Sequence, residues 1–399
     1  MTPYRMFHKA GSVAEHHRSI KDLWEKKWRI LCKLGVYPFF SESKIDDFEN
    51  VFGSSVMQNM KPPYDHDVYA AAFFKSAEDL VRQAQTAEEA HDTAKAAELY
   101  LRAAALYRIA RFPIVQTPKQ REAWERNKEA FFKGAGLLEP PITDVHIPHT
   151  HGIEGEGPHI PLAVRIPSTV NTTSPVPVVI RICGLDGYRT EQFDLSNSLL
   201  ERGWASVGVE IPGTGDSPAR RGDPTSADRL WSSLLDWVDA QPHLDKDRRV
   251  VWGVSTGGYY ATRIAMTHKD RLTGVVSHGG GCHGMFDPVW LTGMNMAEYP
   301  FPLVPALAEG FMFDPQDTKS MRETQRKYSL LENGLLGKDC APLMLANGLN
   351  DTIFPIEDSF LLFQHGPAKS ARFADAAHMG GPNMAEPIFG WIDWLFGGK

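Results

Sequence analysis

The stretch from Arg248 to Ala265, "RRVVWGVSTGGYYATRIA", decides the fold class. An apolar, β-branched run ends at Val254, and a run compatible with a helix follows it. Between them, residues 253–257 spell Gly-Val-Ser-Thr-Gly, the G-x-S-x-G pattern in which a serine occupies a sharp turn between a buried strand and a helix. The context therefore favours Ser255 as a nucleophile, with an ordinary glycine–serine turn as the alternative.

Composition and charge exclude several classes of protein. The chain has 399 residues, of which 42% are hydrophobic and 23% charged, as in a globular protein with a sizeable core. Its formal net charge of −7 gives no basis for binding nucleic acid or an anionic membrane. The four cysteines are scattered without C-x-x-C spacing, which argues against a disulfide framework or a zinc site. We find no apolar run typical of a signal peptide or membrane span, so we expect a cytoplasmic protein.

Two halves of the chain follow different hydrophobic patterns. Residues 1–140 have helical periodicity, with Ser76 and Thr117 as expected N-caps, and end at a double proline. In residues 141–399, apolar strand-like runs alternate with helical segments, which predicts a mainly parallel sheet covered by helices on both faces. We therefore expect a helical N-terminal domain followed by an α/β domain, with an insertion at about 282–337 that forms a cap.

A serine nucleophile needs a histidine base and a carboxylate that orients this base, and the chain offers both downstream. Asp351 follows a buried apolar run, and His378 stands in a glycine-rich loop before the last helical segment. The order serine, acid, histidine is the one expected for this type of turn, with the acid and the base after late strands. Asp375, closer to His378 in sequence, is the second choice for the acid because it falls within the expected strand.

A tetrahedral intermediate also needs two hydrogen-bond donors for its oxyanion. The N–H of Thr256, at the start of the helix after Ser255, is one candidate. The other comes from the loop after the third expected strand, where residues 184–187 spell Gly-Leu-Asp-Gly. Leu185 N–H is the first choice there, and Asp186 N–H is the second. An ordinary tight turn would have the same sequence.

The 15 histidines offer few other functional candidates. His278 and His283 lie in the motif "SHGGGCHG" and either line the pocket or satisfy polar groups of a glycine-rich turn. Four more cluster in sequence, but no carboxylate pattern completes a metal site: His146, His149, His151 and His159. We expect neither a metal ion nor a cofactor.

Together these residues resemble a known family. The motifs "GLDGYR", "EIPGTGDSP", "VVWGVSTGGYYA", "SHGGGCH", "PIED" and "HMGGPN" resemble the fungal polyketide-shortening α/β hydrolases of pigment and melanin pathways, the yellowish-green hydrolase family. The N-terminal segments "LWEKKWRILCKLGVYPF" and "LYRIARFP" extend the resemblance over nearly the whole chain. More distantly, the chain is similar to the FrsA-like hydrolases. Thr256 departs from the small residue expected at its position, which puts the substrate in doubt.

The resemblance implies an α/β-hydrolase fold and a catalytic triad of Ser255, Asp351 and His378. It also implies hydrolysis of a carbon–carbon bond in the acyl side chain of an aromatic polyketide, in which a naphthopyrone-like heptaketide becomes a shortened naphthol. The motifs fit a thiohydrolase, an esterase or an acyltransferase equally well. A hydrolase-fold binding protein without catalysis is a weaker alternative, because the serine, the histidine and the glycines are all present.

A small-molecule polyketide would contact the loops and the cap around Ser255. Aromatic and methionine side chains of the insertion can form an adaptable apolar wall, and packing of the insertion on the core is the alternative. The N-terminal half is expected to cover the site, with pairing to a second copy of the chain left open. Trp24, Trp28, Tyr37 and Phe39 fit either role. The candidate substrate-binding residues are Gly184, Asp186, His278, His283, Met285 and Phe286.

Overall fold

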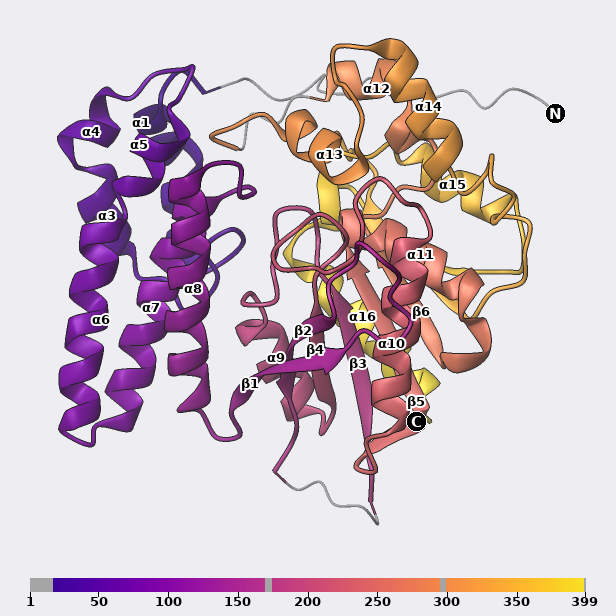
Figure 1. The fold of residues 1–399 in the computed structure, drawn as a ribbon, viewed down its shortest axis with the longest axis horizontal. Coiled ribbons are helices and arrows are strands. Elements are labelled where there is room, and N and C mark those ends of the chain that lie inside the picture. Colours follow the sequence, from indigo (N-terminus) through magenta and orange to yellow (C-terminus); the bar gives the residue numbers. More distant parts are fainter. Residues whose placement is uncertain (1–16, 169–173, 295–298, 398–399) are drawn as a thin grey trace.

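The computed structural model describes residues 17–168, 174–294 and 299–397. Helices α1 to α8 form one layer on the left of Figure 1, and an eight-stranded sheet with its covering helices lies on the right. The chain changes from helices to strands between Gly136 and Ile142. Within the described ranges, we find no helix long and apolar enough to cross a membrane.

The N-terminal helices pack around α7, which lies between α6 and α8. Thr117 caps α8, because its Oγ1 accepts the N–H of Gln120 at 3.4 Å, as the sequence predicts. The prediction that Ser76 caps a helix is wrong, because α6 already begins at Phe74. The ring of Phe74 packs edge-on against Tyr107 of α7, and this tertiary contact favours the earlier start. The elements are α1 (Ile20–Leu23), a π-helical turn η1 (Trp24–Trp28), α2 (Arg29–Leu34), α3 (Ile45–Phe52), α4 (Ser55–Asn59), α5 (His66–Ala71), α6 (Phe74–Glu89), α7 (Thr93–Arg111) and α8 (Pro118–Gly136).

Three of the four aromatic residues near the N-terminus belong to the core of this helical layer. Trp24 stacks on Phe52 with 4.4 Å between ring centroids, and Trp28 meets Phe39 edge-on at 5.6 Å. The rings of Trp24, Trp28, Phe39 and Phe52 are almost fully buried. They stabilise the layer internally, whereas Tyr37 leaves 42% of its surface exposed and reaches toward the sheet.

The sheet is mixed at one end and parallel elsewhere, so the predicted mainly parallel sheet is confirmed. Its order is β1-β2-β4-β3-β5-β6-β7-β8; β1 and β2 run antiparallel to their neighbours, and β3 to β8 are parallel. The strands are β1 (Ile142–Pro148), β2 (His159–Arg165), β3 (Val176–Ile182), β4 (Ala205–Val209), β5 (Leu244–Val254), β6 (Gly274–His278), β7 (Leu343–Gly348) and β8 (Ser370–Ala374).

Helices cover both faces of the sheet, as runs of apolar residues in the strands require. Val250 faces α9 and α16, while its neighbour Val251 faces α10 and α11. The helices after the strands are α9 (Phe193–Glu201), α10 (Ser226–Asp239), α11 (Thr256–Thr267), α15 (Glu357–Phe363) and α16 (Ala385–Leu395).

The chain between β6 and β7, where the sequence predicts an insertion, lies above the carboxyl edge of the strands in Figure 1. Its aromatic side chains pack on α11: Phe286 and Phe311 lie 5.3 and 6.1 Å from the ring of Tyr259. Its elements are a 3₁₀ turn η3 (Gly284–Phe286), α12 (Pro288–Gly293), α13 (Leu303–Phe311) and α14 (Thr318–Tyr328). The division of the chain into two domains and a cap stays a prediction.

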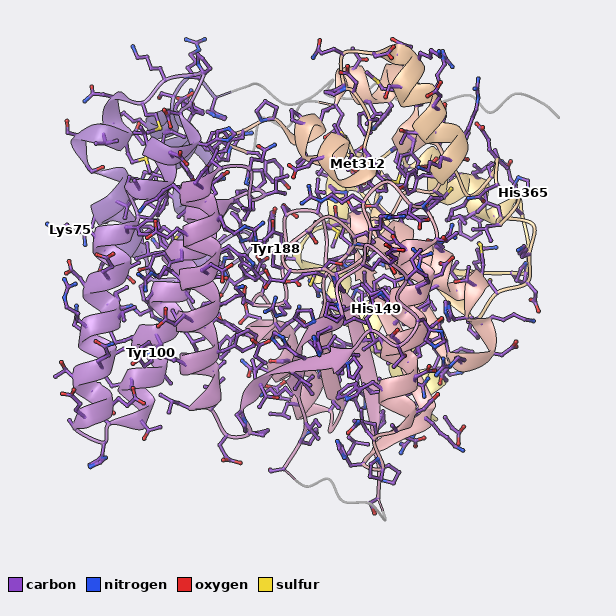
Figure 2. The ribbon with its side chains drawn as sticks, in the orientation of Figure 1. Lys75, Tyr100, His149, Tyr188, Met312 and His365 are labelled. Atoms are coloured by element: carbon purple, nitrogen blue, oxygen red, sulfur yellow. The ribbon has the colours of Figure 1, made fainter. Side chains whose placement is uncertain are left out.

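Buried polar contacts join the helical layer to the sheet. Trp124 of α8 donates its indole N–H to Asp216 at 2.8 Å. Arg111, at the end of α7, is fully buried, and its guanidinium group lies 3.6 Å above the ring of Tyr188. Figure 2 labels Tyr188 in the region between the helical layer and the sheet. These contacts place the end of α7 beside the loop after β3.

Candidate active site

Ser255 occupies the sharp turn between β5 and α11. Its backbone has φ 53° and ψ −124°, a sparsely populated region for a residue with a side chain, at a cost of about 1–3 kcal/mol. The turn is held by two hydrogen bonds: Ser255 N–H donates to the carbonyl of His278 at 2.8 Å, and Gly258 N–H donates to the carbonyl of Ser255 at 2.8 Å. The strained conformation is thus fixed from the neighbouring strand β6 and from the first turn of α11.

Both glycines of the motif are required by close backbone approach. A Cβ atom on Gly253 would stand well inside van der Waals contact of the carbonyl of Gly257. A Cβ atom on Gly257 would collide in the same way with the carbonyl oxygens of Ile182 and Cys183, at the end of β3. The turn therefore sits directly against the start of the loop that follows β3.

The three side chains that the motif order singles out lie in one chain of hydrogen bonds. His378 Nε2 is 3.0 Å from Ser255 Oγ, and His378 Nδ1 is 2.7 Å from Asp351 Oδ2. An ionised carboxylate only accepts hydrogen bonds, so Nδ1 carries the proton and Nε2 is left to accept one from the serine. Asp351 is buried, whereas the histidine keeps some exposure.

The Asp351 carboxylate is held in place by its own donors. Oδ1 accepts the backbone N–H groups of Ile353 at 2.7 Å and Phe354 at 3.0 Å. Oδ2 accepts the side-chain amide of Asn347 at 2.8 Å in addition to His378. Asp375, the second choice, is bonded instead to the side chain of Asn350 at 2.7 Å.

The loop after β3 lies beside Ser255. A Cβ atom placed on Gly184 would stand 3.4 Å from the Cβ of Ser255. Within the described residues, the N–H groups of Leu185 and Thr256 donate to no protein group. Unused amides next to a nucleophile are what an oxyanion site requires, and their role there stays a prediction.

His278 is buried behind the histidine loop. Its Nε2 lies 2.7 Å from the carbonyl of Met379, the residue after His378, and Trp252 Nε1 donates to its Nδ1 at 3.4 Å. Burial, opposed by the hydrogen bond to Met379, lowers the pKa of His278 to about 4, so the ring is neutral near pH 7. These contacts support the loop that carries His378. Substrate contact by His278, as expected from the sequence, stays a prediction.

The other candidate substrate-binding residues are held by the protein itself. His283 Nδ1 lies 2.7 Å from Ser329 Oγ, and the ring of Phe286 packs 5.1 Å from that of Phe311. Met285 is buried with them. Their contacts are those of packing between the insertion and the core, and contact with a substrate stays a prediction for each.

Asp358 is a structural residue whose role the sequence did not indicate. Its carboxylate accepts four consecutive backbone N–H groups at 2.6–3.1 Å, so it fixes the loop that begins the insertion. Asp358 lies in the motif "PIED" and in the first turn of α15. The donors are the N–H groups of Cys282, His283, Gly284 and Met285.

Two features lie apart from this site. The four clustered histidines belong to the β1–β2 hairpin, where His149 bonds Ser233 and His151 bonds Asp236; among the described residues, no group of three potential metal ligands converges.

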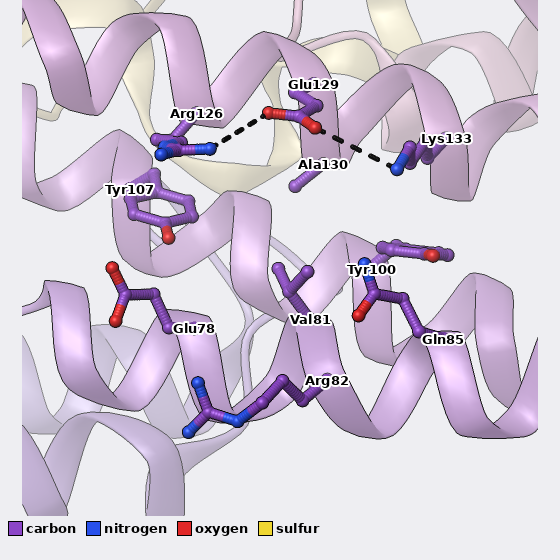
Figure 3. A pocket seen from close by; sticks show the side chains of 10 residues that line it. All are labelled: Glu78, Val81, Arg82, Gln85, Tyr100, Tyr107, Arg126, Glu129, Ala130 and Lys133. Atoms are coloured by element: carbon purple, nitrogen blue, oxygen red, sulfur yellow. Dashed lines mark hydrogen bonds and ion pairs between the residues drawn. The ribbon is translucent and has the colours of Figure 1, made fainter.

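A pocket of about 280 Å³ opens between α6, α7 and α8 (Figure 3). Among its charged lining residues, Glu129 pairs with Arg126 and Lys133.

Comparison with known proteins identifies the class. Over 93% of this chain and 95% of the other, the fold matches a crystal structure of 2,6-dihydroxy-pseudo-oxynicotine hydrolase, with a TM-score of 0.69 and 21% identity. It matches wild-type AbyA5 with a TM-score of 0.67 and 22% identity, over 88% of this chain and 92% of that one. The fold is an α/β-hydrolase fold, as the sequence predicts. A family model described as Esterase FrsA-like matches residues 72–374, so the chain belongs to the FrsA-like esterase family.

Curated relatives agree with this class. The chain is 30% identical over 190 residues to 2,6-dihydropseudooxynicotine hydrolase of Paenarthrobacter nicotinovorans, a match that spans 48% of each chain, about half of that relative's length. It is 26% identical to Hydrolase LUC6 of Fusarium sp, over 84% of this chain and 89% of LUC6. It is 26% identical to Esterase FrsA of Yersinia pestis, over 70% of this chain and 65% of that one. The relatives are named hydrolases and esterases, which supports hydrolase activity.

Proposed function

We propose that the chain is a serine hydrolase in which Ser255 is the nucleophile, His378 the general base and acid, and Asp351 the group that orients the base. The observation that carries the proposal is the unbroken series of hydrogen bonds from Ser255 Oγ through His378 to Asp351. The amides of Leu185 and Thr256 are proposed to bind the oxyanion, since both lie beside the nucleophile without a protein acceptor among the described residues.

The proposed substrate is an aromatic polyketide with a β-dicarbonyl side chain. Ser255 Oγ attacks a side-chain ketone while His378 Nε2 takes its proton, and the tetrahedral intermediate collapses with cleavage of the carbon–carbon bond. The electron pair of that bond enters the neighbouring carbonyl as an enolate, which the protonated His378 then protonates at carbon. Water, deprotonated by His378, attacks the acyl-serine and releases a carboxylic acid and free Ser255.

The resemblance of the motifs quoted above to those of polyketide-shortening hydrolases, along nearly the whole chain, supports this substrate class. The similarity to Hydrolase LUC6 over most of both chains supports hydrolysis, without indicating a substrate. Hydrolysis of an ester or thioester by the same residues is the second candidate, and the family description, Esterase FrsA-like, favours it.

Incubation with a heptaketide naphthopyrone in H₂¹⁸O, followed by mass spectrometry, tests the proposed reaction. We expect a naphthol shortened by the acyl unit, and that unit recovered as a carboxylic acid containing ¹⁸O. Ser255→Ala is expected to form neither product. An unchanged naphthopyrone, with enzyme that hydrolyses aryl esters through Ser255, would assign the chain to the second candidate.

A further inference from the structure

The side chain of Asp186, in the loop after β3, is clamped by two tyrosines from distant parts of the chain. Tyr37, in the segment after α2, and Tyr299, in the insertion, both donate their hydroxyl groups to Asp186 Oδ2, the second at 2.9 Å. The two hydroxyl oxygens are 3.0 Å apart. Burial of the Tyr37 hydroxyl group, with Asp186 and Tyr299 beside it, raises the pKa of this tyrosine, so it keeps the proton that it donates.

The second oxygen of this carboxylate lies near the turn that carries Ser255. Asp186 Oδ1 and Ser255 Cβ each lie 3.4 Å from the point where a Cβ atom on Gly184 would stand, so the two are on the same side of that glycine. Asp186 is only 8% exposed. Among the described residues, no group donates a hydrogen bond to its Oδ1. This oxygen is not sealed from solvent by the protein, so a substrate beside Ser255 can reach it and donate a hydrogen bond to it.

The clamp and its surroundings hold the carboxylate in one orientation. Arg111 donates to the backbone carbonyl of Asp186 at 2.8 Å and pairs with Glu191. Phe112 stacks on the ring of Tyr299, with 5.2 Å between centroids and 9° between planes. The helical layer, the insertion and the loop after β3 thus converge on Asp186. A polar group fixed in this way can discriminate between ligands, because its orientation costs nothing at binding.

We propose that Asp186 is a specificity residue: its Oδ1 accepts a hydrogen bond from a hydroxyl group of the substrate that lies close to the attacked carbonyl. The inference rests on the proposed nucleophile, Ser255. An anionic group at this position would be repelled by the carboxylate, and an ammonium group would bring a further charge into a buried site. A substrate without a donor would leave the carboxylate oxygen unpaired, which is the strongest form of discrimination that a polar pocket offers.

The test compares two esters that differ by one hydroxyl group, p-nitrophenyl butyrate and p-nitrophenyl 3-hydroxybutyrate, after correction for their rates in hydroxide alone. We expect the wild-type protein to have a kcat/KM roughly tenfold to a hundredfold higher for the hydroxy ester. In Asp186→Asn, we expect the hydroxyl groups of the two tyrosines to donate to the amide oxygen. The NH₂ group is then turned toward Ser255. The ratio of the two kcat/KM values is then expected to fall to one or to reverse.

Control variants keep the test decisive. Asp393→Asn changes an exposed carboxylate of α16 and should leave the preference unchanged. If Asp186→Asn does not fold, Tyr299→Phe removes one of the two donors that orient the carboxylate, and the preference should fall roughly threefold or more. Tyr107→Phe is the control for Tyr299→Phe, because Tyr107 lines the separate pocket between α6, α7 and α8.

The outcomes separate this inference from the proposed nucleophile. Equal preferences in the wild-type protein and Asp186→Asn, with Ser255 reactive toward a fluorophosphonate, would overturn the inference alone. If neither ester is hydrolysed but Ser255 reacts with the fluorophosphonate, the comparison is made by competition. We then measure how strongly each ester slows the labelling of Ser255 in the wild-type protein and in Asp186→Asn. If Ser255 in the folded protein does not react at all, the proposed function and the inference both fail.

Discussion

Asp351 Oδ2 lies 2.7 Å from His378 Nδ1 and fixes the proton on that nitrogen. The opposite nitrogen is thereby left as the acceptor for Ser255. In the proposed reaction we therefore expect the carboxylate to be required, although it lies on the far side of the histidine from the serine.

Asp351→Asn should therefore lower turnover by about 10⁴, because an amide permits the wrong tautomer of His378. Asp375→Asn is the matched control, since that carboxylate bonds Asn350 and not the histidine. Steady-state kinetics on an aryl ester would measure both. A smaller loss for Asp351→Asn than for Asp375→Asn would show that the wrong carboxylate has been assigned.

Gly257→Ala should destabilise the protein by at least about 1–3 kcal/mol, because its Cβ would collide with the backbone at the end of β3. Gly136→Ala is the control: outside the backbone of α8 itself and the neighbouring residues, no described atom lies within 4 Å of its Cβ position, and the change should alter the free energy of unfolding by less than about 1 kcal/mol. Urea denaturation distinguishes them. Equal stability of the two variants would contradict the close approach of α11 to β3.

His278 should make the folded state sensitive to acid. Its pKa is about 4 in the folded protein and near 6.5 when unfolded, so between these values the unfolded chain binds a proton that the native state does not. Stability therefore falls as the pH drops from 6.5 to 4, by about 3 kcal/mol from this group. His278→Gln removes the titration while retaining a donor for Met379. Urea denaturation from pH 4 to 7 should show the variant less sensitive to pH, and parallel curves for the two proteins would refute the assignment.

Asp358→Asn should destabilise the protein by about 3 kcal/mol or more. An amide oxygen without charge is a weaker acceptor for the four backbone N–H groups of the loop at 282–285. The exposed Asp393→Asn should change the free energy of unfolding by less than about 0.5 kcal/mol. Thermal or urea denaturation of both variants measures the difference. If Asp358→Asn is as stable as the control, the carboxylate does not hold the loop.

The sequence predicted the features that depend on local pattern. A buried strand, the motif around Ser255 and the helix after it follow from residue order, and strands alternating with helices predicted the parallel sheet. The motif order also singled out Asp351 and His378, which the structure brings into contact, while their catalytic roles remain predictions.

Contacts between distant segments escaped the sequence because no pattern encodes them. Tyr37 and Asp186 are 149 positions apart, and only packing of the helical layer on the sheet brings them together. Trp24 and Trp28 looked equally suited to a surface, because an aromatic residue has the same sequence signature in a core and at an interface. Ser76 failed as a cap because a tertiary contact of Phe74 extends the helix beyond it.

Covalent labelling of the folded protein by a fluorophosphonate, with the site identified by peptide mass spectrometry, tests the central claim most directly. We predict one label per chain, on Ser255, with no labelling of Ser255→Ala and much slower labelling of His378→Ala. Folded protein that takes no label, or takes it on another residue, would contradict the assignment of Ser255 as the nucleophile.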